Sequence, residues 1–153
     1  MSNFLEVGVK AAEFNLVNVD GQEINLKDFR GKKIVLYFYP KDNTPGCTAQ
    51  ACSLRDWYDG ILATGAVVMG VSPDNTASHV KFKEKFGLPF YLLSDTDHQV
   101  AEAYGAWGEK TMCGRTSMGI IRSTFVIDEE GMIKKVFEKV NTKTHGEDVL
   151  KVL

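Results

Sequence analysis

The strongest constraint on the fold is a continuous apolar run, IVLYFY, at residues 34–39. Most of its residues are β-branched or aromatic, which favours a strand over a helix. A half-buried strand would alternate apolar and polar residues, and this run does not. It is typical of a strand at the centre of a parallel sheet, with other elements covering both faces.

Strand and helix patterns alternate on either side of this run. Asp20-Gly21 separates two alternating segments, residues 15–19 and 22–26, and so predicts a hairpin. Thr44-Pro45 begins a helical pattern that runs to Gly65. Its apolar positions are Ala51, Leu54, Tyr58 and Leu62. A strand at 67–71, a helix ending at Gly87, a strand at 90–93 and a helix after Asp95 or Asp97 follow.

The C-terminal third begins with residues 105–121, which have no clear periodicity and are predicted to be a long loop. Residues 123–127 and 132–137 flank Glu130-Gly131 and predict a second hairpin, and residues 145–153 predict a last helix. This order predicts an α/β fold of thioredoxin-like architecture, a mixed sheet with an N-terminal hairpin and flanking helices. We expect one domain over residues 1–153.

Charge and composition exclude several classes of partner. The formal net charge is -2 and the pI is about 5.9, so the chain lacks the basic field that binds a nucleic-acid backbone. No apolar run approaches the ~20 residues of a membrane helix, and no secretory signal is visible. We therefore expect a cytoplasmic protein that binds neither nucleic acid nor membrane.

The three cysteines, Cys47, Cys52 and Cys113, are too few for a secreted disulfide framework. With Thr44 as N-cap and Pro45 at N1, Cys47 falls in the first helical turn. There the helix dipole and the unpaired N–H groups stabilise a thiolate, the nucleophilic form of cysteine. The alternative is that Cys47 is a small buried apolar residue, although its place at a helix start favours reactivity.

Cys52 lies five residues further along the same predicted helix. An intact helix places the two Cα atoms about 8.6 Å apart, because it rises about 1.5 Å per residue on a radius of about 2.3 Å. A disulfide needs less than about 7 Å, so pairing requires the helix start to unwind. Cys52 is equally well interpreted as a core contact, and Cys113, in the predicted loop, as a spare thiol.

Other kinds of site find little support in the sequence. The Cys-x4-Cys spacing is wider than in zinc knuckles, and we expect no metal or other cofactor. Phosphate, dinucleotide and serine-hydrolase motifs are missing. The isolated histidines are predicted to be solvated or capping residues and the tryptophans to be core residues; these are His79, His98, His145, Trp57 and Trp107.

A thiolate that attacks a peroxide needs a cation, a group that orients the peroxide, and a pocket that excludes water. Thr44, three residues before Cys47, offers a hydroxyl donor, and Pro40 offers a pocket wall without an N–H. Several cations remain possible on spacing alone: Lys41, Arg55, Arg115 and Arg122.

Residues 40–47, PKDNTPGC, resemble the PxxxTxxC signature of peroxiredoxins in the form found in the bacterioferritin comigratory (Q-type) branch. Residues 47–52, CTAQAC, are similar to that branch's placement of a resolving cysteine. Residues 119–128, GIIRSTFVID, resemble its arginine-bearing strand, and residues 93–100 and 104–110 also match its pattern.

The resemblance implies a thioredoxin-dependent antioxidant peroxidase that reduces hydrogen peroxide and organic hydroperoxides. It implies that Cys47 is the peroxidatic nucleophile and Cys52 the resolving cysteine, that Arg122 holds the thiolate, and that Thr44 and Pro40 bind and shield the peroxide. Thioredoxin or a similar dithiol is the implied reductant, no cofactor is implied, and many members are monomers. The alternatives are a thioredoxin-type thiol–disulfide oxidoreductase and a non-enzymatic metal or redox-sensing module.

Overall fold

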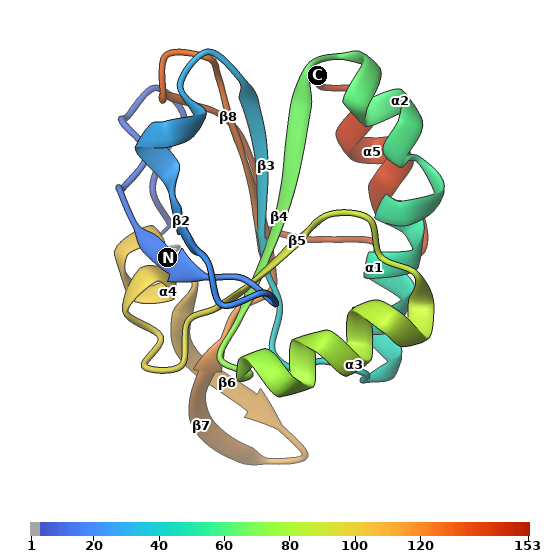
Figure 1. Cartoon of the computed structure of the whole chain (residues 1–153). Helices are drawn as coiled ribbons and strands as arrows, with labels where there is room; N and C mark the ends of the chain where they lie inside the picture. The colour runs from blue at the N-terminus through green and yellow to red at the C-terminus, as the bar shows by residue number, and fades with distance from the viewer. Residues whose placement is uncertain (1–3) are drawn as a thin grey trace.

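The computed structural model describes residues 4–153, which form a seven-stranded sheet and a separate two-stranded ribbon (Figure 1). The sheet has the order β2-β1-β5-β4-β3-β8-β9, and its central strands β3, β4 and β5 are parallel. All other neighbours in the sheet pair antiparallel. The sheet strands are β1 (Asn15–Val17), β2 (Glu23–Asn25), β3 (Lys33–Phe38), β4 (Ala66–Ser72), β5 (Tyr91–Ser94), β8 (Ser123–Ile127) and β9 (Ile133–Phe137).

Strand β3 separates two apolar layers, as the run at 34–39 predicts. Ile34, Leu36 and Phe38 belong to one core cluster, and Val35 and Tyr37 to the other. Figure 1 shows α1, α2, α3 and α5 over the face of the second cluster and α4 on the opposite side. The predicted thioredoxin-like mixed sheet with flanking helices is confirmed.

The helices are short. They are the 3-10 helix η1 (Leu26–Phe29) and the α-helices α1 (Pro45–Asp56), α2 (Tyr58–Ala63), α3 (Thr76–Phe86), α4 (Gln99–Tyr104) and α5 (His145–Leu150). Asn75 caps α3 by accepting from the N–H of Ser78, and Gly87 ends it with a left-handed φ of 60°. In the described residues, no helix is both long and apolar enough to cross a membrane.

The single helix predicted from residue 44 to Gly65 is wrong, because the helix breaks at Trp57. Ala51 and Leu54 are buried as expected, but Leu62 and Trp57 are largely exposed. The apolar spacing continues across the break and therefore conceals it. The prediction of a core position for Trp57 is likewise wrong, whereas Trp107 packs against the core.

The loop predicted at 105–121 is in fact a hairpin of β6 (Trp107–Met112) and β7 (Arg115–Ile120) that projects from the body (Figure 1). The two residues of its turn, Cys113 and Gly114, both have positive φ angles. This is the backbone geometry that tight two-residue turns require. Most of the described side chains of β7 are exposed, so the ribbon has no buried face that would give an alternating pattern.

Helix α5 packs closely against α1. The N–H of Gly146 donates to Ser53 Oγ at 2.9 Å in a buried hydrogen bond. A Cβ atom on residue 146 would overlap the backbone carbonyl of Ser53, so only glycine permits this approach. The contact, which we call the α5 clamp, fixes α1 at Ser53, one residue after Cys52.

Candidate active site

Cys47 lies in the first turn of α1, where the chain arrives from the end of β3. Thr44 has the extended backbone of an N-cap residue, Pro45 occupies the first helical position, and Cys47 follows two residues later. The predicted helix start is therefore confirmed. The Cys47 side chain is only 1 % exposed, and the unpaired N–H groups of the helix start surround this position. The site favours a negative charge on sulfur.

Arg122 is the cation that reaches this sulfur. It directly precedes β8, and its Nη2 donates to Cys47 Sγ at 3.3 Å. Its Nη1 donates to Gln50 Oε1 at 2.6 Å, which orients the guanidinium over the helix start. A Cβ atom on residue 46 would lie 3.1 Å from Arg122 Nη2, so Gly46 allows the close approach. We call Cys47, Gln50 and Arg122 the thiolate cluster.

Gln50 is a residue that the sequence analysis missed. It lies one helical turn after Cys47, on the same side of α1, and is completely buried. The i, i+3 spacing from the predicted nucleophile is the signal that could have found it. Its Nε2 is buried without a hydrogen-bond partner among the described residues, so the amide is bonded on one side only.

The charges of the thiolate cluster change the pKa values of two neighbouring groups, Tyr37 and Lys110. Burial raises the pKa of Tyr37 well above its usual value, and the negative charge of Cys47 adds to this effect. Burial lowers the pKa of Lys110, the positive charge of Arg122 lowers it further, and the charge of Cys47 opposes both. Lys110, on β6, is thus a second cation near the site that the sequence analysis did not consider.

The other candidate cations lie elsewhere. Lys41 and Arg115 are exposed, and neither forms a hydrogen bond through its side chain within residues 4–153. Arg55 Nη1 donates to the carbonyl of Phe86 at 2.7 Å, and its Nη2 forms an ion pair with Asp56 at 3.0 Å. Of the four cations considered from sequence, Arg122 is therefore the one that contacts Cys47.

Thr44 and Pro40 border the loop between β3 and α1. The hydroxyl of Thr44 donates to the carbonyl of Lys41 at 2.9 Å and does not cap the helix. Its proton is therefore engaged, and the lone pairs of Oγ1 are what it offers to a ligand. Pro40 is half-buried where β3 leaves the sheet. The roles of both residues toward peroxide stay predictions.

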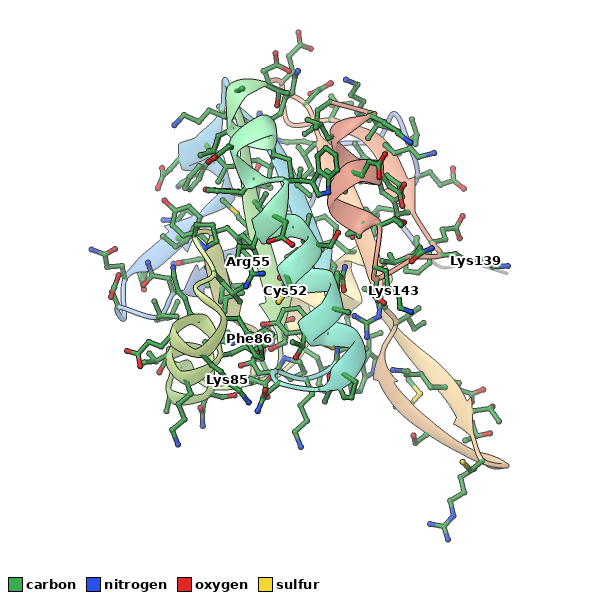
Figure 2. All side chains as sticks on the ribbon, turned by 90° about the vertical axis from the view of Figure 1, so that its right-hand side faces the viewer. Cys52, Arg55, Lys85, Phe86, Lys139 and Lys143 are labelled. Carbon is green, nitrogen blue, oxygen red and sulfur yellow. The ribbon has the colours of Figure 1, made fainter. Side chains whose placement is uncertain are left out.

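Cys52 is half-buried on the outer side of α1, and Figure 2 shows it on the helical face turned to the viewer. Cys47 and Cys52 lie in one continuous helix and both are free thiols. Their pairing therefore requires the unwinding that the spacing predicts. Cys113 lies exposed at the tip of the β6–β7 ribbon.

A second polar cluster holds the loop through Asp42, which is one of the loop residues. The carboxylate of Asp42 accepts from Tyr39 Oη at 2.6 Å, Ser78 Oγ at 2.8 Å and His79 Nδ1 at 2.7 Å. The N–H of Asp42 donates to Asp74 at 2.8 Å. We call this cluster, formed by Tyr39, Asp42, Asp74, Ser78 and His79, the loop anchor.

The prediction that the histidines are solvated or capping residues is wrong for two of them, because His79 and His145 are completely buried. His79 Nε2 contacts the carbonyl of Leu93 at 3.1 Å while Nδ1 faces Asp42, so both ring nitrogens face acceptors. His145 bonds Thr124 at 2.8 Å, and burial lowers its pKa from 6.5 to about 4.

Asp42, Asp74 and His79 are also a group whose ligand-type atoms lie close enough together to hold a metal ion. Each of them already bonds its neighbours: Asp42 bonds His79, and Asp74 accepts from Asp42 and from Ser72 Oγ at 2.7 Å. The donor set is therefore satisfied internally. His98, the remaining histidine, is half-buried and stacks on Trp107 with 3.7 Å between ring centroids.

A thioredoxin-like sheet that presents a buried cysteine at a helix start, beside a guanidinium group, defines the class of thiol-dependent redox proteins. Within that class, residues 7–136 match the AhpC/TSA family, and the chain belongs to this family.

Curated relatives cover nearly the whole chain. Peroxiredoxin Bcp of Bacillus subtilis is 48% identical over 149 residues, which are 97% of this chain and 95% of that protein. Peroxiredoxin Bcp of Escherichia coli K12 is 47% identical over 148 residues, again 97% of this chain and 95% of that protein. The predicted resemblance to the Bcp branch of peroxiredoxins is confirmed.

Solved structures agree with this assignment. The bacterioferritin comigratory protein of Xanthomonas campestris, described for its alkyl peroxide reduction activity, superimposes with a TM-score of 0.85 at 36% identity and covers 90% of this chain and 88% of its own. A cysteine-to-serine mutant of Xylella fastidiosa PrxQ superimposes with a TM-score of 0.90 at 33% identity and covers 96% of this chain and 94% of its own. The protein is thus a thiol peroxidase, an antioxidant oxidoreductase of the peroxiredoxin type.

Proposed function

We propose that this peroxidase reduces hydrogen peroxide and organic hydroperoxides at Cys47. The observation that carries the proposal is the 3.3 Å contact between Arg122 Nη2 and Cys47 Sγ at the start of α1. The thiolate attacks one peroxide oxygen, the O–O bond breaks, and the other oxygen leaves as water or an alcohol after taking up a proton. Cys47 is left as a sulfenic acid, which is the first and reversible product when a thiolate is oxidised.

In this proposal Arg122 stabilises the thiolate and the charge that develops on the departing oxygen. Thr44 Oγ1 accepts a hydrogen bond from the peroxide O–H, because its own proton is engaged by Lys41. Pro40 shields the pocket without offering an N–H that would compete for the peroxide.

The second half of the proposed cycle uses Cys52. Its thiol attacks the sulfenic sulfur of Cys47, a disulfide forms, and the hydroxyl leaves as water. The intact helix separates the two Cα atoms by about 8.6 Å, so residues at the start of α1 unwind in this step. A dithiol such as thioredoxin then supplies two electrons and two protons and restores both thiols.

We further propose a single-domain, cytoplasmic monomer. The large apolar side chains that are exposed among residues 4–153 come from separate segments and include Val7, Trp57, Leu62 and Met118. Such scattered exposure supports a chain without an obligate partner. Sedimentation equilibrium that gave a dimer at micromolar concentration would contradict the monomer.

The cycle is tested by intact mass after one equivalent of peroxide, in the wild type and in three cysteine variants. We expect Cys47→Ser to lose peroxide turnover, and Cys52→Ser to consume one equivalent and stop as a sulfenic acid. Cys113→Ser is the matched control and should cycle like the wild type. Turnover that persisted in Cys47→Ser would overturn the assignment of the nucleophile, and full cycling in Cys52→Ser would move resolution to another thiol.

A further inference from the structure

Positively charged side chains flank Cys52 on the outer face of α1. Figure 2 shows Cys52 with Arg55, Phe86 and Lys85 on one side and Lys143 on the other, and Lys139 lies farther out beyond Lys143. These residues come from α1, from the end of α3, and from the segment between β9 and α5. We call this set of six residues the Cys52 patch.

The charge of the patch is largely uncompensated. Arg55 is paired with Asp56, but within residues 4–153 the ammonium groups of Lys85, Lys139 and Lys143 take part in no ion pair. Lys85 bonds only the neutral amide of Asn43, at 3.2 Å. Because the whole chain carries a net charge of -2, this positive face is a local feature.

The patch also holds a preorganised apolar group. The half-buried ring of Phe86 packs edge-on against Phe82, with 5.5 Å between centroids, and Lys85 Nζ lies 5.3 Å from its centre. Arg55 fixes the Phe86 backbone through its carbonyl. An aromatic side chain that is already ordered loses little conformational freedom when a partner covers it.

We propose that the Cys52 patch is the docking surface for the reductant, and that the reductant is an acidic dithiol protein. This inference rests on the proposed function, because it assigns a partner to the disulfide of that cycle. Charge complementarity selects the partner: a negatively charged surface around its dithiol meets Lys85 and Lys143 on either side of Cys52. Phe86 supplies the apolar contact between these charges.

The location also selects which sulfur is attacked. In the intact helix Cys52 is half-buried on the outer side of α1, whereas Cys47 is 1 % exposed. Cys52 also adjoins Ser53, which the α5 clamp fixes, so Cys52 stays beside the patch when the start of α1 unwinds. The reductant thiolate attacks Cys52 Sγ, the Cys47–Cys52 bond breaks, and Cys47 leaves as a thiolate beside Arg122. The second thiol of the reductant then attacks the reductant's first sulfur in the mixed disulfide, and Cys52 leaves as a thiolate. Two electrons pass to the enzyme, and the reductant becomes a disulfide.

The test compares two reductants on the complete protein: a thioredoxin of net negative charge, and dithiothreitol, which is small and uncharged. In the double variant Lys85→Glu/Lys143→Glu we expect kcat/KM for thioredoxin to fall roughly tenfold or more at low salt, because like charges now face each other. The difference from wild type should shrink at about 0.5 M salt, where charges are screened. The neutral pair Lys85→Gln/Lys143→Gln should give a smaller loss.

Lys27→Glu is the matched control, because this exposed lysine belongs to η1, far from α1 across the sheet (Figure 1). It should leave both reductants unaffected. A loss in the double variant no greater than in Lys27→Glu would overturn the docking surface, while turnover with dithiothreitol would leave the proposed function standing. If the wild type turned over with neither thioredoxin nor dithiothreitol, the proposed function itself would be overturned.

Discussion

The thiolate cluster and the loop anchor both adjoin the loop at residues 40–44, and they differ in how completely their side chains are hydrogen-bonded. In the loop anchor, Asp42 alone receives three side-chain hydrogen bonds and both nitrogens of His79 have partners. In the thiolate cluster, Arg122 provides the two bonds, and the amide nitrogen of Gln50 has no partner among the described residues.

This difference matches what the proposed cycle asks of each cluster. The loop that carries Thr44 must keep its position while peroxide binds, so a saturated network suits it. The start of α1 must unwind before Cys47 can meet Cys52, and the thiolate cluster adds only two side-chain hydrogen bonds to the backbone bonds of the helix. We therefore expect substitutions in the loop anchor to affect mainly stability, and substitutions in the thiolate cluster to affect mainly the reaction.

The largest effect is expected for His79→Ala, which removes one of the three side-chain hydrogen-bond partners of the buried Asp42 carboxylate. The free energy of unfolding should fall by about 3 kcal/mol, because a buried charged acceptor loses a hydrogen bond. Urea unfolding measures this. His98→Ala is the matched control, since that ring is half-buried, and it should cost less than about 1 kcal/mol. If the two variants lost the same free energy of unfolding, the loop anchor would not have the stabilising role that we assign to it.

Arg122→Ala tests the thiolate cluster. Without the guanidinium group, the second-order rate constant for peroxide should fall roughly 100-fold or more, since a donor aimed at developing charge is lost. The free energy of unfolding should fall by about 1–2 kcal/mol, less than in His79→Ala, because the buried Gln50 Oε1 loses its donor. Stopped-flow oxidation gives the rate, and Arg115→Ala, on the exposed ribbon, is the control. A fall of less than about threefold would transfer the role to Lys110.

His145 is a buried histidine outside the loop anchor, so it shows how burial alone affects stability. Its pKa is lowered to about 4 in the fold, against 6.5 in its ordinary state, so the unfolded chain takes up a proton first as the pH falls. Its stabilising contribution is complete above pH 6.5 and is lost towards pH 4. Between pH 7 and pH 5 the loss should be about 2 kcal/mol.

Urea unfolding of wild type and His145→Gln across this pH range measures the contribution of His145. The variant lacks the titrating ring, so its stability should depend less on pH by that amount. Identical pH profiles would show that this ring does not titrate differently in the folded and unfolded chains.

The smallest effect is expected for Gln50→Met, which keeps the length of the side chain and removes the acceptor for Arg122. The peroxide rate constant should fall roughly 3- to 10-fold, the equivalent of one hydrogen bond to a charged group. Because Gln50 acts by positioning Arg122, Gln50→Met should add nothing to Arg122→Ala in the double variant. Additive effects would mean that Gln50 has a separate role.

Where residue pattern and packing coincide, the fold could be predicted from sequence. The run at 34–39 indicates a central strand, and β3 has a helical layer on one face and a second apolar layer on the other. Asp20-Gly21 likewise predicts the hairpin of β1 and β2, in which Leu16 pairs with Ile24. Local turn chemistry and burial agree in these elements, so sequence alone is sufficient.

The β6–β7 ribbon could not be predicted in this way. Its turn, Cys113-Gly114, places a cysteine at positive φ, whereas asparagine and aspartate are the residues that usually signal such a turn. The ribbon also projects from the body, so its side chains carry no alternation between buried and exposed positions. Its pairing depends on backbone hydrogen bonds, which leave no pattern in the sequence.

The site divides in the same way. The position of Cys47 follows from Thr44-Pro45, because the preference of proline for the first helical position is a local signal. The choice of Arg122 among four cations depends on the antiparallel pairing of β8 with β3, which is a long-range contact. The i, i+3 spacing from Cys47 is the one local signal for Gln50, whereas the buried network of His79 depends on packing between α3 and the loop and leaves no local signal.

The α5 clamp sets the thermodynamic character of the proposed disulfide. Because α1 is fixed at Ser53, only the turns that contain both cysteines can melt, and the scaffold beyond them keeps its packing. A disulfide that closes so short a loop stabilises the protein little, because it restricts the unfolded chain only slightly. The disulfide form also lacks the backbone hydrogen bonds of the unwound turns. When the disulfide is reduced, these turns become helical again and regain their hydrogen bonds. The stability of the helix therefore favours the dithiol form of the enzyme.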